Sequence, residues 1–555
     1  MKKILATISQ QEWRLVWLLA LVMIIITGLP YLAGYFFAPN GFTYNGLHAL
    51  SPGDIPVYYS YINQARSGEI FVKNLLTPEP QAFGTLNIWW AWIGQLAGIF
   101  NLPVILAFQL SRLIMIPVFL TVAYIFIAYF FSDRAVRLTA LIFLLFSSGL
   151  GFYVAAPIDA LGIEGPDPYR WPIDLWLTEA NTFNTLYQTS HFIASITLMI
   201  LIFLLMALAF ESRRKMVYAA VSGVLALCYF NFHPYYFPVI FGVLGLYLFG
   251  LMLRANRFLW REAGYLIVVF LISLPSVIYH FWLIGASPVI GQRAIQNVTN
   301  ISPFIFVVLG YGLLWLGFIL GLWFLWHQKK FDRRHWLLLS WFIVDIVLIY
   351  SPFPFHSRYT QGLHIILVIF TVIGLSELGA YLRTRLKPAT YDFWINNSVL
   401  LILLFVIWLM PSNLYSVGRD FYFIFSNSPA ITTKLFLPNG LFDAYAWLAT
   451  QQSRAGVVFG ADIPLKFAPG FSGHAVYAAH AHETLFFGSK AAYIQWFFLD
   501  NDYADKKHEF LLANNISYLI YSDYEKELGS FNPALHKYLH EVFSSQGVTV
   551  YQVVQ

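Results

Sequence analysis

Apolar runs of about 20 residues recur along the chain, and they limit the fold more than any other feature. Each run is long enough to cross a bilayer core, which is about 30 Å thick. Of the 555 residues, 59% are hydrophobic and only 11% are charged, whereas soluble domains carry about 25% charged residues. The sequence therefore predicts a polytopic helical membrane protein. The net charge of +5 does not indicate nucleic-acid binding, because basic residues in short loops set membrane orientation instead.

Eleven of these runs are predicted to span the membrane. They are residues 13–37, 103–131, 136–156, 190–210, 216–232, 234–253, 264–284, 304–326, 336–351, 363–382 and 395–412. The first run is too long for a signal peptide and is followed by no small-residue cleavage site, so we expect it to be retained. The only cysteine, Cys228, falls within a predicted span. This excludes an intrachain disulfide and argues against a cysteine metal or redox site.

The segment 83–100, "FGTLNIWWAWIGQLAGIF", is long enough to span, but its tryptophans are typical of a helix in the membrane interface. Loop charge favours the interfacial helix. With this assignment the cytoplasmic segments hold 18 Lys and Arg, and the outer loops up to residue 412 hold five. If the segment spanned, every later basic loop would face outward, against the positive-inside rule. The N-terminus is therefore predicted to be cytoplasmic and the C-terminal region extracytoplasmic.

The C-terminal region, residues 413–555, is less apolar than the preceding 412 residues and is predicted to form a small α/β domain. Short strands are expected in "AGVVFGAD", "ISYLIYS" and "GVTVYQVV", and helices in "GLFDAYAWLATQQS" and "KKHEFLLANN". The expected organisation is thus an all-α transmembrane domain over 1–412, with a first outer loop at 38–102, and an extracytoplasmic domain over 413–555. No repeat or low-complexity tract is evident in the sequence.

Polar and aromatic side chains collect on the predicted outer face. The loops there contribute Asp54, Tyr58, Tyr59, Tyr61, Arg66, Glu69, Asp159, Asp167, Asp174, Glu179, Asn184, His191, His233, His356, Arg358, Tyr359, Gln361 and His364. A carboxylate near an apolar interior has a raised proton affinity, which suits a general base. An arginine at the end of a span can bind phosphate in bidentate fashion. Together these residues would suit transfer of a group from a lipid phosphate to a hydroxyl, with Asp54 accepting the proton and Arg358 holding the phosphate.

The layout resembles the GT-C superfamily of membrane glycosyltransferases, which includes protein O-mannosyltransferases, the lipid A aminoarabinose transferase and the oligosaccharyltransferase catalytic subunit. Asp54 in "SPGDIPVYYSYINQARSGE" matches the acid that follows the first span, and "FGTLNIWWAWIGQLAGIF" matches a surface helix of the first loop. Arg112 in "FQLSRL" and the stretch "FHSRYTQGLHIILVI" match arginine-bearing stretches near later spans. The C-terminal stretch "FSGHAVYAAHAHETLFFGSK" is similar to a pattern in a subgroup of uncharacterised bacterial GT-C-like proteins.

The resemblance implies an inverting transferase that uses a polyprenyl-phosphate-linked sugar, with a glycan, lipid or protein acceptor left open. It assigns catalysis to Asp54. The candidates for binding the donor phosphate or substrate are Arg358, Tyr359, Arg112, His356, His191, His233, Tyr58 and Glu69, and those for the acceptor or a lid are His474, His480, His482 and Glu483. A second acid motif is not clear, although "DPY" at 167–169 could supply one. A divalent metal, Mg or Mn, is therefore left open.

Each candidate has a structural alternative. Asp54 precedes a helix with an early proline, so it would also suit an N-cap. Arg358 would also suit an interfacial cation. His191 and His233 would suit satisfied helix ends, and the three C-terminal histidines would suit a positioning loop better than a zinc site, because no cysteine joins them.

Three other functions also fit parts of the pattern. A transporter or flippase would place ionisable residues near the middle of its spans and often shows repeats. In this sequence the ionisable residues collect at one face of the membrane, with Asp345 in "WFIVDIVLIY" as the exception. A ligase or polymerase of lipid-linked glycans would share the donor chemistry. A non-catalytic scaffold whose C-terminal region binds a partner would look much the same by sequence.

Overall fold

The computed structural model describes residues 1–50, 52–160, 170–211, 215–387, 390, 397–426, 428, 433–451 and 456–554. The chain forms two compact units. The bundle unit comprises Met1–Pro30, Arg112–Ile278 and Thr299–Phe421, and the loop unit comprises Tyr31–Ser111, Tyr279–Val298 and Tyr422–Gln555. The sequence predicted two domains, 1–412 and 413–555, each continuous in the chain. The compact units follow spatial contacts instead, and they group the first loop with the C-terminal region.

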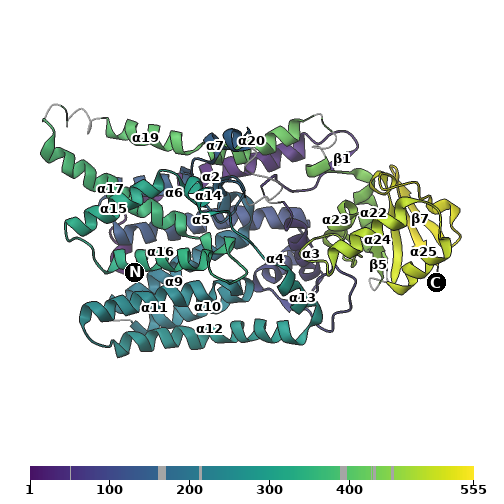
Figure 1. Ribbon diagram of the computed structural model, residues 1–555, viewed down its shortest axis with the longest axis horizontal. Helices are drawn as coiled ribbons and strands as arrows, with labels where there is room; N and C mark the ends of the chain where they lie inside the picture. The colour runs from purple at the N-terminus through teal and green to yellow at the C-terminus, as the bar shows by residue number, and fades with distance from the viewer. Residues whose placement is uncertain are drawn as a thin grey trace. The chain divides into compact units, whose positions relative to one another are not determined.

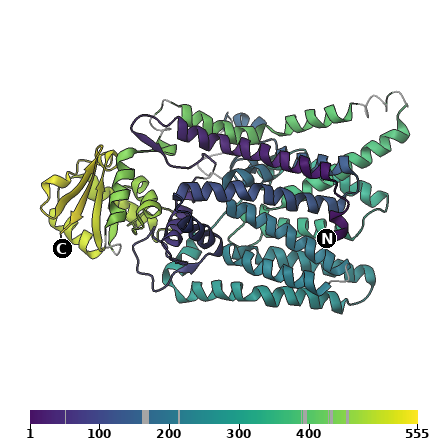
Figure 2. The same cartoon turned by 180° about the vertical axis from the view of Figure 1, so that it is seen from behind.

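Eight apolar helical segments are long enough to cross a membrane, judged by length and composition of the described residues. They are α2 (Gln10–Phe36), α5 (Val104–Phe130), α6 (Arg134–Phe146) with α7 (Gly151–Ala160), α9 (Ser190–Glu211), α10 (Lys215–Phe232), α11 (Phe237–Ala255) with the turn η2 (Pro234–Tyr236), α12 (Trp260–Ala286), and α17 (Leu363–Arg385) with the turn η3 (Ser357–Thr360). Figures 1 and 2 both show α9, α10, α11 and α12 side by side. The chain is a multi-pass membrane protein.

Two further pairs of helices add up to ten spans if each bent pair counts as one. The first pair, α14 (Phe304–Tyr311) and α15 (Leu314–His327), bends by 80°. The bend falls at Gly312, whose positive φ of 50° and close approach to Leu150 exclude a larger residue. The second pair, α19 (Ser398–Leu409) and α20 (Pro411–Phe425), bends by 52° where Pro411 removes a backbone donor.

The ninth predicted span, 336–351, forms α16 (Arg333–Ile349), which has 17 residues and is shorter than the other candidates. The structure therefore confirms the polytopic all-α class but not the count of eleven. Short elements complete the bundle unit: α1 (Lys2–Leu5), η1 (Ile173–Leu175) and α8 (Thr182–Gln188).

The first loop contains two short helices, α3 (Ile55–Arg66) and α4 (Ile88–Ile99), that pack against each other. A Cβ added at Gly94 of α4 would lie 2.4 Å from the Cβ of Ala65, so the two helices approach as closely as glycine allows. With 12 residues, α4 rises only about 18 Å. It is too short to cross the bilayer core, as the interfacial interpretation of 83–100 requires.

Small sheets connect parts of the loop unit. β1 (Phe42–Tyr44) pairs antiparallel with β4 (Phe436–Pro438), and β2 (Phe71–Val72) pairs with β3 (Thr85–Leu86). The helices α13 (Pro288–Gln296) and α23 (Asp462–Ser472) belong to the same unit, and α23 packs on α3. The first loop and the C-terminal region therefore belong to the same compact unit.

The C-terminal α/β fold is confirmed by a four-stranded sheet of order β5-β6-β8-β7. Its strands are β5 (Val457–Phe459), β6 (Ile516–Tyr521), β7 (Leu539–Ser545) and β8 (Val548–Val553), and its helices are α22 (Asn439–Thr450), α24 (Phe487–Leu499) and α25 (Ala504–Ala513), with the short turns α26 (Asp523–Lys526) and η4 (Pro533–Leu535). Neighbouring side chains of a strand face opposite sides of a sheet. Leu519 of β6 joins the core with α24 and α25, and Tyr518 contacts Trp447 of α22, so helices cover both faces.

Candidate active site

Asp54 occupies the N-cap position of α3 without acting as a cap. An N-cap aspartate normally accepts a hydrogen bond from the first turn of its helix, but within the described residues 52–66 its side chain makes no such bond. Its Oδ1 lies instead 3.4 Å from Nε2 of His480, and the side chain is 36% exposed. The carboxylate therefore faces the C-terminal region and retains access to solvent or substrate.

His480 is buried, and hydrogen bonds fix its ring. Its Nδ1 accepts from the backbone N–H groups of His482 and Glu483, each at 3.2 Å. A nitrogen that accepts carries no proton, so the proton resides on Nε2. That nitrogen lies 3.1 Å from the carbonyl oxygen of Gly53, next to its contact with Asp54.

An ion pair lies beside this contact. Nη2 of Arg293 in α13 lies 2.6 Å from Oε1 of the buried Glu483. Burial alone would lower the pKa of Arg293, but Glu483, Tyr61 and Asp54 raise it above its usual value. Burial raises the pKa of Tyr61 to about 12, so its hydroxyl is neutral at physiological pH. Groups of both charges thus surround Asp54.

Hydrogen bonds from two directions hold the segment that carries His480. Asn74 of the first loop donates to the carbonyl of Glu483 at 2.8 Å, and Thr484 donates to the carbonyl of Leu76 at 2.5 Å. Gln296 of α13 donates to the carbonyl of Thr484 at 2.9 Å. The local sequence gives no sign of these partners, because they are distant along the chain.

In the bundle unit, Arg358 forms an ion pair. Its Nη1 lies 2.5 Å from Oε1 of Glu179, whose side chain is fully buried, and its guanidinium lies 5.3 Å from the ring centre of Phe192. A phosphate at Arg358 would therefore compete with a carboxylate that has no access to water. Sequence reasoning placed Glu179 on the same face but did not identify it as the partner of Arg358.

Histidines predicted to bind substrate also lie in this unit. The rings of His191 and His233 are 5.0 Å apart, and Nδ1 of His191 lies 3.0 Å from Oγ1 of Thr189. Burial, with His191 and Arg358 nearby, lowers the pKa of His233 well below its usual value. Nε2 of His356 forms a hydrogen bond with the carbonyl oxygen of Ser351 at 2.7 Å. The structure thus brings His191, His233 and Arg358 together.

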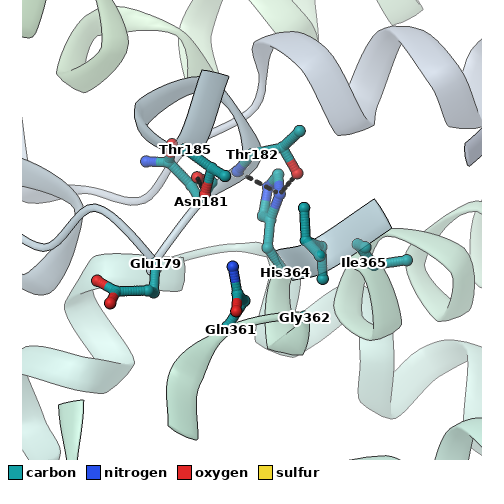
Figure 3. A pocket seen from close by; sticks show the side chains of 9 residues that line it. Glu179, Asn181, Thr182, Thr185, Gln361, Gly362, His364 and Ile365 are labelled. Atoms are coloured by element: carbon teal, nitrogen blue, oxygen red, sulfur yellow. Dashed lines mark hydrogen bonds between the residues drawn. The ribbon is translucent and has the colours of Figure 1, made fainter. Parts of the chain in front are cut away.

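A small cavity of about 10 Å³ lies among Glu179, Asn181, Gln361 and His364, which is room for about one water molecule. Figure 3 shows Glu179 on one side, His364 on the other and Gln361 between them. Nδ1 of His364 lies 3.1 Å from Oγ1 of Thr182. His364 therefore serves the packing of the bundle, and the cavity is too small for a sugar or phosphate.

The buried carboxyl group of Asp174 should make the stability of the folded protein depend on pH. Burial raises its pKa to about 7, against hydrogen bonds from Ser412, Gly151 and Gly149 that lower it. The pKa in the unfolded chain is about 3.9, so the folded state holds more protons between about pH 4 and about pH 7. Stability is therefore lost as pH rises through this window. We expect the melting temperature of the wild type, relative to Asp174→Asn, to fall from about pH 4 to about pH 7; parallel curves would contradict the assignment.

The other predicted site residues are placed as follows. In the bundle unit, Tyr359 is buried in η3, and Arg112 is buried and donates to Thr27 and to the carbonyl of Leu186. In the loop unit, Tyr58 stacks on Trp90, Glu69 and His482 are exposed, and His474 is buried with its ring against Tyr518. The "DPY" at 167–169, named as a second acid motif, lies outside the described residues.

Sequence reasoning gave Asp54 and His480 separate roles, and the structure places them in contact. It missed Arg293 and Tyr61 as neighbours of this pair. Arg293 lies in a nine-residue helix that Ser287 caps and Pro288 opens, and such a helix in a short loop could have been recognised from "SPVIGQR". Among the described residues, no group of three His, Cys, Asp or Glu side chains is arranged to hold a metal ion.

These features define a class by fold. A multi-pass helix bundle, a first loop that carries short helices, and a C-terminal α/β domain together make a GT-C-type fold. No known protein family and no curated protein matches the sequence.

Solved structures of this fold are similar to the chain. One is the Archaeoglobus fulgidus oligosaccharyltransferase in the apo form, with a TM-score of 0.54, 12% identity, and coverage of 97% of this chain and 74% of that one. Another is the archaeal oligosaccharyltransferase AglB from Archaeoglobus fulgidus in complex with an inhibitory peptide and a dolichol-phosphate. Its TM-score is 0.51 at 13% identity, and the match covers 98% of this chain and 75% of that one. ArnT from Cupriavidus metallidurans in the apo state has a TM-score of 0.48 at 14% identity, and the match covers 96% of this chain and 97% of that one. At these identities the likeness to the two oligosaccharyltransferase structures, with TM-scores above 0.5, establishes the fold and not the activity.

Proposed function

We propose that the protein is a membrane glycosyltransferase that moves a sugar from a polyprenyl-phosphate-linked donor to an acceptor on the extracytoplasmic face. The observation that carries the proposal is the placement of Asp54. Its carboxylate opens α3 without capping it, contacts Nε2 of His480 and remains 36% exposed. The fold supports the choice of donor, since one solved structure of this fold holds a dolichol-phosphate.

In the proposed reaction, the acceptor oxygen attacks the anomeric carbon of the sugar as its proton passes to the carboxylate of Asp54. The bond between the anomeric carbon and the phosphate oxygen breaks, and the polyprenyl phosphate leaves with the electron pair. Attack opposite the leaving group inverts the anomeric centre. The reaction as proposed uses only side chains of the protein.

Arg358 remains the proposed ligand of a donor phosphate within the bundle unit. To bind phosphate, its guanidinium must share or leave Glu179, which lies 2.5 Å away. The planar guanidinium has five N–H donors, so it can bond a second anion while one nitrogen stays on the carboxylate. Tyr359, Arg112, His356, His191 and His233 are proposed to shape this region, and Tyr58 and Glu69 the first loop.

The direct test uses purified protein in nanodiscs with polyprenyl-phosphate sugars and candidate hydroxyl acceptors. We expect free polyprenyl phosphate to appear, at a rate that depends on the acceptor, when lipids are analysed by mass spectrometry. The matched control is the same preparation of Asp54→Asn. Movement of intact donor across the membrane without release of polyprenyl phosphate would contradict the proposal and favour a flippase.

A further inference from the structure

We infer that His480 is a positioning residue, supplied by the C-terminal region to hold the carboxylate of Asp54 in its working orientation. This inference rests on the proposed function, because it assigns Asp54 the task of a base. His480 acts through Asp54. Nε2 of His480 contacts Gly53, which lies 427 positions earlier in the chain, and the adjacent residue Asp54.

Both ring nitrogens of His480 have hydrogen-bond partners, and these partners fix the orientation of the ring. The N–H groups of His482 and Glu483 hold Nδ1, so the ring cannot turn without losing both bonds. Nε2–H then donates to the carbonyl of Gly53 at 3.1 Å, and Oδ1 of Asp54 lies 3.4 Å from the same nitrogen. Because the ring is only 6% exposed, water competes little for these contacts.

The loop beneath the ring is also fixed. Arg293 pairs with Glu483, and Gln296 donates to the carbonyl oxygens of His482 and Thr484 at 3.1 and 2.9 Å. Two anchors from α13 therefore set the position of the backbone that sets the ring. Such support from neighbouring groups is what a precisely held carboxylate needs, since a shift of about 1 Å can lower a rate roughly 100-fold.

Three substitutions separate positioning from packing. His480→Ala removes the ring, and His480→Phe keeps a ring without donors. His480→Gln keeps an N–H that can reach the place of Nε2. We expect kcat to fall roughly 10- to 100-fold in the alanine and phenylalanine variants, with KM for the donor unchanged, and to recover most of its value in the glutamine variant.

The outcomes decide between roles. Wild-type kcat in His480→Ala or His480→Phe overturns the inference. So does an equal loss in the glutamine and phenylalanine variants, because a packing role does not distinguish them by their donor. If His480→Ala does not fold, as judged by size-exclusion chromatography, the glutamine and phenylalanine pair still decides.

A readout without activity keeps this inference distinct from the proposed function. In a Cys228→Ala background, Asp54→Cys with His480→Cys should be joined by a short bifunctional thiol reagent, detected as a linked peptide by mass spectrometry. Each single-cysteine variant is the control. No linked peptide overturns the contact itself. A linked peptide together with full activity of Asp54→Asn would leave the contact standing and overturn the proposed function.

Discussion

Asp54→Asn is expected to lower the rate of sugar transfer by about 10²- to 10⁴-fold, the range that general-base catalysis contributes. The asparagine oxygen can still take the place of Oδ1, which lies 3.4 Å from Nε2 of His480, so the local geometry is preserved. Because the aspartate side chain does not cap α3, the substitution removes no helix cap and should leave the melting temperature unchanged. The effect should appear in kcat, with KM for the donor unaffected, since the base acts in the transition state. The measurement is polyprenyl phosphate released per enzyme.

Asp523→Asn is the matched control for this substitution. Its side chain is 85% exposed and pairs with Lys526 within the same short helix, so the same chemical change there should leave the rate at the wild-type value. Full activity of Asp54→Asn would remove the central residue of the proposal. Asp345, fully buried in α16, would then be the residue to replace in a transport assay.

Arg358→Ala is expected to destabilise the folded protein by about 3–5 kcal/mol. The side chain of Glu179 is fully buried, and loss of its partner would leave an uncompensated charge in the interior. The measurement is the unfolding transition in detergent micelles. Replacement of both residues, as Glu179→Gln with Arg358→Met, should recover most of the loss, because a buried ion pair can be replaced by neutral side chains at little cost.

Lys330→Ala supplies the comparison within the same unit. Lys330 is 54% exposed and pairs with Glu377 at 2.8 Å, so its loss should cost no more than about 1 kcal/mol. If Arg358→Ala were as stable as Lys330→Ala, Glu179 would not depend on Arg358 for its charge balance. Arg358 would then be available to a phosphate without loss of structure.

The sequence predicted those parts of the fold that depend on local pattern. Apolar runs predicted most of the spans, and short stretches rich in β-branched and aromatic residues predicted β5, β6 and β8. β7 was missed because its residues Leu539–Ser545 include His540, Glu541 and two serines and are largely exposed, so no apolar alternation marks it. The count of eleven spans is not confirmed, because α16, which covers most of the predicted span 336–351, is a helix of only 17 residues.

The candidate site was predictable in its residues but not in its contacts. Asp54 stands out as an acid after an apolar span, and "HAHE" stands out as a polar cluster. Nothing local to either stretch indicates that they meet, because contacts across hundreds of residues leave no periodicity. The alternative role of Asp54 as a helix cap was a reasonable inference from "SPGDIP", and only the position of its side chain argues against it.

The pairing of β1 with β4 has a consequence for the order of assembly during synthesis. Thr43 bonds to Asn439, 396 positions later, and at about 5–20 residues per second the first loop must wait roughly 20–80 s for its partner strand to be made. Through that interval the early loop lacks the segments that later surround Asp54. A nascent chain halted before His480 would therefore lack the residue that we propose positions Asp54, and we expect it to transfer sugar more slowly than the full chain.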